Sequence, residues 1–146
     1  MSDTTGKLKD LIELLHDGEK FYTEAATKVK VPAFANLFAR MARMKQAIAN
    51  DLSTQVGSHG EKAPTGGTMF GALRQLYTDI RASMSRDAEA VYVAQLEQTE
   101  DRILEAFRDE LTKSDNVEVR NIAERHYPEI KRAHDEMRDL KSRLAA

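Results

Sequence analysis

Hydrophobic residues recur every three or four positions over most of the chain, which is the period of an amphipathic helix. The pattern predicts a first helix over residues 7–30 and a second over residues 33–56. Pro32 is expected to close the first helix and Gly57 to end the second. Because the turn between them is very short, the two helices should pack as an antiparallel hairpin.

The second half of the chain continues with the same period. A third helix is predicted over residues 87–113, and a fourth starts at Asp115, which has capping-box spacing to Glu118. No alternating run of β-branched residues predicts a sheet. The fold class is therefore all-α, a four-helix bundle. We expect a single domain over residues 1–146, with a short disordered N-terminus over about residues 1–6.

A long connection separates the second predicted helix from the third. Residues 57–67 collect glycine, serine, proline and threonine, a composition typical of a loop. The apolar residues between Phe70 and Met84 then predict a short extra helix. A connection of this length can run along the bundle and would make the second and third helices parallel, although an up-down-up-down order stays open.

The composition excludes several classes of protein. The chain has 146 residues and no cysteine, so disulfides, thiolate nucleophiles, iron–sulfur clusters and zinc fingers are excluded. Its 22 basic and 24 acidic side chains are mixed, which argues against nucleic acid or a membrane surface as the main partner. No apolar run approaches the roughly 18 residues of a membrane span, so we expect a cytoplasmic protein.

Acidic residues interrupt the predicted core. Glu97 and Glu100 occupy successive inward positions on the third helix, and Glu19 flanks the inner stripe of the first. His134 lies beside the inner stripe of the fourth helix. At about 1.5 Å per residue, all four lie near the middle of a bundle roughly 35–40 Å long. They should converge on one interior layer, where an unpaired charge would be costly.

Such a layer is typical of bundles that bind two iron or manganese ions. These take a Glu from each of two helices and a Glu-x-x-His pair from each of the other two. Glu19, Glu97, Glu100 and His134 are therefore candidate metal ligands, and iron or manganese is the cofactor that they would take. Both Glu-x-x-His pairs are incomplete, because Lys131 lies three residues before His134 and the middle of the second helix has neither residue type.

Two alternatives to a dinuclear centre stay open. Glu97, Glu100 and His134 could hold a single ion, with His16 as a fourth ligand. The ligand count instead favours a hydrogen-bonded or ion-paired network that fixes the register of the bundle without chemistry. The cations and hydroxyls that could pair with the acidic layer are those of Arg43, Lys45, Lys131, Tyr22 and Tyr92.

Three stretches carry a resemblance to a known family. They are residues 11–26 (LIELLHDGEKFYTEAA), residues 97–101 (EQTED) and residues 133–135 (AHD). Here the chain resembles small bacterial ferritin-like four-helix-bundle proteins catalogued as a domain of unknown function, and the likeness extends from about Leu8 to Leu144. The resemblance implies a ferritin-like fold and no established activity. Ferritins and rubrerythrin-type relatives oxidise and store iron, but their complete ligand set is absent from this sequence.

The sequence therefore predicts a non-enzymatic ferritin-like bundle that acts as a homo-oligomer or binds a protein partner. One alternative is a metal-binding oxidoreductase or iron-handling protein that uses the four candidate ligands. Another is a helix-mediated adaptor, in which the predicted helix between Phe70 and Met84 docks on a partner chain.

Overall fold

The computed structural model of the chain describes residues 3–66 and 88–145, and these form four long helices. Their bounds are α1 (Asp3–Lys28), α2 (Pro32–Ser58), α4 (Ala88–Lys113) and α5 (Val117–Ala145). The described residues contain no strand, so the predicted all-α class is confirmed. None of the described helices is long and apolar enough to cross a membrane. The short helix predicted between Phe70 and Met84 lies outside the described residues.

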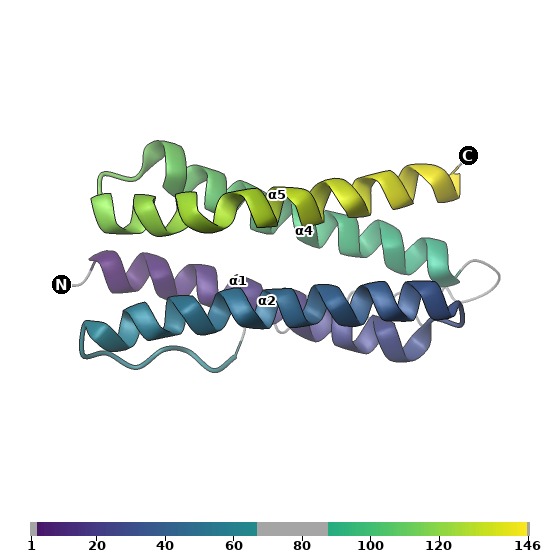
Figure 1. The fold of residues 1–146 in the computed structure, drawn as a ribbon, viewed down its shortest axis with the longest axis horizontal. Coiled ribbons are helices and arrows are strands. Elements are labelled where there is room, and N and C mark those ends of the chain that lie inside the picture. The colour runs from purple at the N-terminus through teal and green to yellow at the C-terminus, as the bar shows by residue number, and fades with distance from the viewer. Residues whose placement is uncertain (1–2, 67–87, 146) are drawn as a thin grey trace.

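The helices form two antiparallel hairpins, α1 with α2 and α4 with α5, packed against each other (Figure 1). Figure 1 shows α2 and α4 running in the same direction, opposite to α1 and α5. The packing agrees, because Leu8 near the start of α1 shares a buried cluster with Val56 and Phe107, near the ends of α2 and α4. The second and third long helices are therefore parallel, which is the crossover order left open by the sequence.

The first helix begins earlier than its hydrophobic pattern predicts. α1 starts at Asp3, so most of the stretch expected to be disordered, residues 1–6, is helical. The hydroxyl of Thr5 donates a hydrogen bond of 2.9 Å to the Glu61 carboxylate, which follows α2. A tertiary contact thus holds a first turn whose threonines and glycine are poor helix formers.

The second helix ends later than predicted. Gly57 is still helical, and the left-handed residue is Gly60, with φ of 77°. The amide of Gly60 donates to the carbonyl of Gly57 at 2.9 Å, and the amide of Glu61 donates to the carbonyl of Val56 at 3.3 Å. This pair of bonds is a Schellman motif, for which glycine is the preferred residue. The prediction of an end at Gly57 is wrong for this reason.

The predicted cap of the last helix is one residue too early. The Asn116 side-chain oxygen accepts a hydrogen bond of 3.0 Å from the amide of Val119. Asn116, rather than Asp115, therefore satisfies the first amides of α5. The predicted capping box between Asp115 and Glu118 is wrong.

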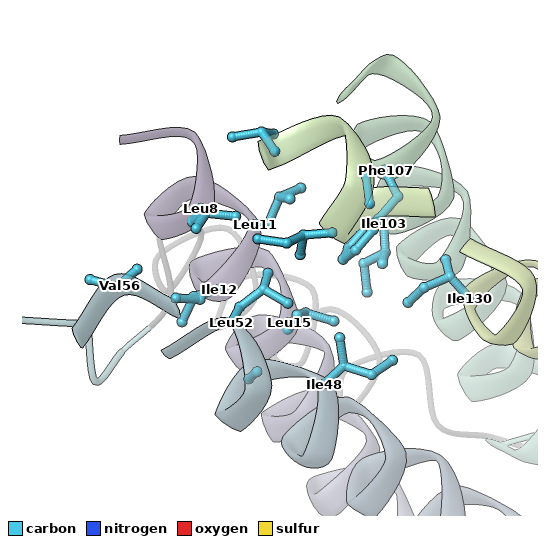
Figure 2. Close-up of a cluster of buried hydrophobic side chains, with 14 of the residues drawn as sticks. Leu8, Leu11, Ile12, Leu15, Ile48, Leu52, Val56, Ile103, Phe107 and Ile130 are labelled. Atoms are coloured by element: carbon cyan, nitrogen blue, oxygen red, sulfur yellow. The ribbon is translucent and has the colours of Figure 1, made fainter. Parts of the chain in front are cut away.

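The core consists of two apolar clusters. Figure 2 shows the first, to which all four helices contribute, with Leu8, Leu11, Ile12, Leu15, Ile48, Leu52, Val56, Ile103, Phe107 and Ile130 labelled. The second contains Phe21, Tyr22, Ala25, Val29, Phe38, Met41, Ala42, Tyr92, Val93, Leu96, Ala133, Met137 and Leu140. The clusters are separated by residues 16–20 on α1, 43–47 on α2 and 97–102 on α4. The buried polar residues in these three segments form a polar layer between the two apolar clusters.

Gly18 of α1 lies in this layer, and replacing it should destabilise the fold. A Cβ at Gly18 would lie 3.0 Å from Cδ1 of Ile103 and 3.5 Å from Cε of Lys45. We expect Gly18→Leu to lower the free energy of unfolding by about 1–3 kcal/mol, because overpacking outweighs the better helix propensity of leucine. Urea denaturation followed by far-ultraviolet circular dichroism measures this change.

Gly6 provides the matched control, because a Cβ there would meet nothing within 4 Å. Gly6→Leu should leave the free energy of unfolding unchanged or raise it by up to about 1 kcal/mol. Equal stability of Gly18→Leu and the wild type would contradict this account, because it would show that the polar layer can accommodate a larger side chain at this position.

Candidate functional site

The polar layer is built around an ion pair between α2 and α4. The side chains of Lys45 and Glu100 are both 0% exposed, and Lys45 Nζ lies 2.7 Å from Glu100 Oε2. An ammonium and a carboxylate at this distance neutralise each other in a buried site. This interpretation, a buried network rather than a reaction centre, is one of the two alternatives that the sequence left open.

Tyr22 of α1 completes the group. Its hydroxyl donates a hydrogen bond of 2.5 Å to the same Glu100 Oε2, and its ring centroid lies 5.5 Å from Lys45 Nζ. The carboxylate oxygen thus faces an ammonium and a phenol, while the ammonium also lies within cation–π range of the ring. Tyr22, Lys45 and Glu100 are called the central cluster below, and they tie α1, α2 and α4 together.

The local sequence explains how Lys45 enters the core. It follows Met41 by four residues and precedes Ile48 by three, so it belongs to the buried face of α2. Its methylene stem passes close to Gly18, where a Cβ would lie 3.5 Å from Cε and 3.7 Å from Cδ. Four methylene groups suit an apolar surrounding, and only the charged end requires a partner.

The central cluster leaves two polar atoms incompletely satisfied. Among the described residues, Glu100 Oε1 has no hydrogen-bond partner, and Lys45 Nζ has none beyond its ion pair. Because desolvation is costly, such a pair adds little net stability compared with apolar residues of the same size. Removing one member alone, however, leaves the other charge buried and unpaired. A shift of α2 against α4 would separate the charges in the same way, so the cluster opposes other alignments of these helices.

Tyr22 is held in its neutral form. Complete burial, together with the adjacent Glu100 carboxylate, raises the pKa of Tyr22 well above its ordinary value of 10.0. The phenol therefore acts as a permanent donor to the carboxylate at neutral pH.

The candidate ligands predicted from the sequence have separate partners. Glu100 belongs to the central cluster, while Glu19 lies 3.6 Å from His16 Nδ1 with its side chain 27% exposed. Glu97 and His134 lie in a common group of potential ligands, although Lys141 also contacts Glu97. The structure thus brings two of the four candidates together, and the complete four-residue metal layer stays a prediction.

The central cluster does not fit the dinuclear metal centre that was one hypothesis for the acidic layer. Such a centre needs carboxylates or imidazoles from each helix. The residue that α2 supplies is instead Lys45, whose ammonium forms an ion pair with the Glu100 carboxylate. The other cations considered from the sequence lie elsewhere, since Arg43 is exposed and Lys131 pairs with Asp135 at 2.9 Å.

A second group of polar side chains lies between α4 and α5. Glu97, Asp101 and His134 each offer one ligand atom, and these atoms all lie within 4.8 Å of one another. They are called the outer triad below. Asp101 was not predicted from the sequence because it lies on the exposed face of α4; its only signal is that it follows Glu97 by one helical turn.

His134 is held between two carboxylates. Its Nε2 lies 2.6 Å from Asp101, and its Nδ1 lies 3.0 Å from Asp135. Hydrogen bonds from Lys131 and His134 lower the pKa of Asp135 to about 2, so this carboxylate is ionised at neutral pH.

Another histidine–carboxylate contact joins α5 to α2. Asp51 lies 2.6 Å from His126 Nε2 and 2.7 Å from the Arg125 guanidinium. Partial burial disfavours the charged carboxylate, but the hydrogen bonds from His126 and Arg125 outweigh it and lower the pKa of Asp51.

Comparison with known families places most of this chain in one sequence family. The family described as Domain of unknown function (DUF2383) matches residues 3–113. This region contains α1, α2 and α4, and therefore every member of the central cluster. Comparison with the curated proteins gave no match.

A double-mutant cycle should reveal the coupling between Lys45 and Glu100. We expect Lys45→Met and Glu100→Met each to lower the free energy of unfolding by about 3–5 kcal/mol, because each leaves a buried charge unpaired. The loss in the double variant should be smaller, by at least about 2 kcal/mol, than the sum of the losses in the two single variants. Urea denaturation of the four proteins gives the coupling.

The control is the exposed pair of Lys113 and Asp109, which are 3.3 Å apart on one face of α4. Its cycle should give a coupling below about 0.5 kcal/mol. A similarly small coupling for the buried pair would contradict the role given to it.

Tyr22→Phe should change both the stability and its dependence on pH. Because the variant loses a hydrogen bond to a charged group, its free energy of unfolding should fall by about 1.5–3 kcal/mol at neutral pH. In the wild type the folded chain keeps the Tyr22 proton that the unfolded chain loses. The stability linked to this group is therefore complete below the ordinary pKa of 10.0 and decreases as the pH rises above it.

Urea denaturation at several pH values between about 8 and 11 tests this dependence. The wild type should lose stability with rising pH more steeply than Tyr22→Phe. Parallel curves for the two proteins would show that Tyr22 ionises as readily in the folded chain as in the unfolded one.

Proposed function

The chain belongs to the family described as Domain of unknown function (DUF2383), and we propose that it is a non-enzymatic ferritin-like bundle whose core is closed by an internal ion pair. The observation that carries this proposal is the fully buried contact of 2.7 Å between Lys45 and Glu100. The Lys45 ammonium provides the positive charge that a metal cation provides in ferritin-like bundles with a metal centre. It neutralises the central carboxylate but cannot bind dioxygen or change its oxidation state.

The topology supports the ferritin-like assignment. α2 and α4 are parallel, as in bundles whose second and third helices are joined by a long crossover connection (Figure 1). Polar residues also gather halfway along the bundle, between two apolar clusters, where related bundles build cofactor sites. Both features support a scaffold of the ferritin type, whereas the residues at its centre are of a different chemical kind.

The balance of charge supports the absence of core metal chemistry. Two divalent cations bring four positive charges, which several carboxylates must neutralise. The central cluster contains one carboxylate, one ammonium and a neutral phenol, so its charges already cancel. A metal ion bound to this cluster would have to displace the Lys45 ammonium, whose side chain is 0% exposed.

Because the central cluster is buried and balanced in charge, we propose that the protein acts by binding, either to further copies of itself or to another protein. The metal-binding oxidoreductase is the competing proposal, and it requires Glu100 as a ligand. Iron oxidation separates the two, because only the oxidoreductase accelerates it through Glu100.

The test is oxidation of Fe(II) by air after anaerobic loading of the purified protein. We expect the wild type, Glu100→Gln and the surface control Glu61→Gln to oxidise iron at the rate of buffer alone, within about twofold. Absorbance of the ferric product follows the reaction. Faster oxidation by the wild type and by Glu61→Gln, but not by Glu100→Gln, would overturn the proposal.

A further inference from the structure

We propose that the outer triad of Glu97, Asp101 and His134 is a site for one divalent transition-metal cation of the Zn²⁺ type. The site shares Glu97 and His134 with the four-residue layer predicted from the sequence, but it takes Asp101 in place of Glu19 and Glu100. It uses only α4 and α5, and it includes Asp101, whose side chain is 54% exposed. The inference is independent of the function proposed for the central cluster.

The donor set suits such a cation. One imidazole nitrogen and two carboxylate oxygens, all within 4.8 Å of one another, are ligands that zinc, manganese and ferrous iron accept. Glu97 and Asp101 are one helical turn apart on α4, and His134 faces them from α5. The described helices therefore fix three donors in advance, while exposed Asp101 leaves an approach from water.

The orientation of His134 is the observation that most favours a cation. Asp135 accepts from Lys131 at 2.9 Å and lies 3.0 Å from His134 Nδ1, so this carboxylate orients the imidazole ring. The Nε2 atom then lies 2.6 Å from an Asp101 oxygen. Nε2 therefore points at a carboxylate of the triad, where it could share a bound cation with Asp101.

Cation binding requires two small rearrangements. Ligand atoms bound to zinc at about 2.0–2.2 Å lie roughly 3–3.5 Å apart. The contact of 2.6 Å between His134 and Asp101 must therefore open, and any wider separation within the triad must close around the ion. Lys141, whose Nζ lies 3.3 Å from Glu97 Oε1, must also withdraw. Its side chain is 47% exposed, so it can return to water at little cost. Lys141 is therefore a competitor of the cation for Glu97.

Isothermal titration calorimetry of the full chain with ZnCl₂ tests the site. The wild type should bind one equivalent, and Asp101→Asn and His134→Gln should each weaken the affinity by at least about tenfold. Asp135→Asn should weaken it by about tenfold by releasing the imidazole. Lys141→Met should tighten it by about threefold to tenfold, because the competing ammonium is lost.

His126→Gln is the matched control, since His126 also contacts a carboxylate, Asp51, but belongs to no group of three such donors in the described residues. It should leave the affinity for Zn²⁺ unchanged. Circular dichroism confirms folding of each variant, and exposed Asp101 can be replaced without disturbing the core.

Three results would overturn the inference. They are no binding of Zn²⁺ by the wild type up to about 1 mM, undiminished affinity in both Asp101→Asn and His134→Gln, and an equal loss in His126→Gln. None of them bears on the central cluster, because iron oxidation dependent on Glu100 tests that cluster separately.

Discussion

The buried ion pair between Lys45 and Glu100 is the constraint on which the alignment of the bundle depends. It lies between two apolar clusters, and each of its charges is fully removed from water. Sliding α2 against α4 by one turn would leave both charges unpaired in the core, at a cost comparable with the whole stability of a small domain. Gly18 leaves room for the methylene stem of Lys45, and the Tyr22 hydroxyl donates a hydrogen bond to the Glu100 carboxylate. The apolar clusters supply most of the stability, and the pair selects the register.

Much of this arrangement could be predicted from the sequence, because it depends on periodicity within single helices. The inward position of Glu100 follows from the apolar residues around it, and the parallel course of α2 and α4 was one of two orders consistent with the long connection. The partner of Glu100 could not be chosen. A lysine on an apolar stripe can extend to solvent, so only contacts between helices identify Lys45 as the buried cation. The errors at Gly57 and Asp115 have a similar origin, since nearby residues could end or cap each helix and the tertiary packing selected Gly60 and Asn116.

Three of the four polar residues predicted to form one layer are divided between two chemical environments, and the fourth, Glu19, contacts His16 instead. The central cluster is sealed, charge-balanced and built from three helices, whereas the outer triad is open to water and built from two. Heptad counting finds residues that face inward, so it identified Glu97 and Glu100 but not the exposed Asp101. In the proposed account, the bundle has a ferritin-like scaffold, and the Lys45 ammonium is the cation at its centre. Any metal chemistry would then be confined to the surface between α4 and α5.

Anomalous X-ray diffraction from crystals soaked in Mn²⁺ would test the central claim most directly, because it locates the metal and the lysine in the same experiment. We expect no anomalous peak within bonding distance of the Glu100 oxygens, with Lys45 still paired to Oε2 as in the described contact. A peak bonded to Glu100, with the Lys45 side chain turned away, would contradict the account and assign the core to metal binding.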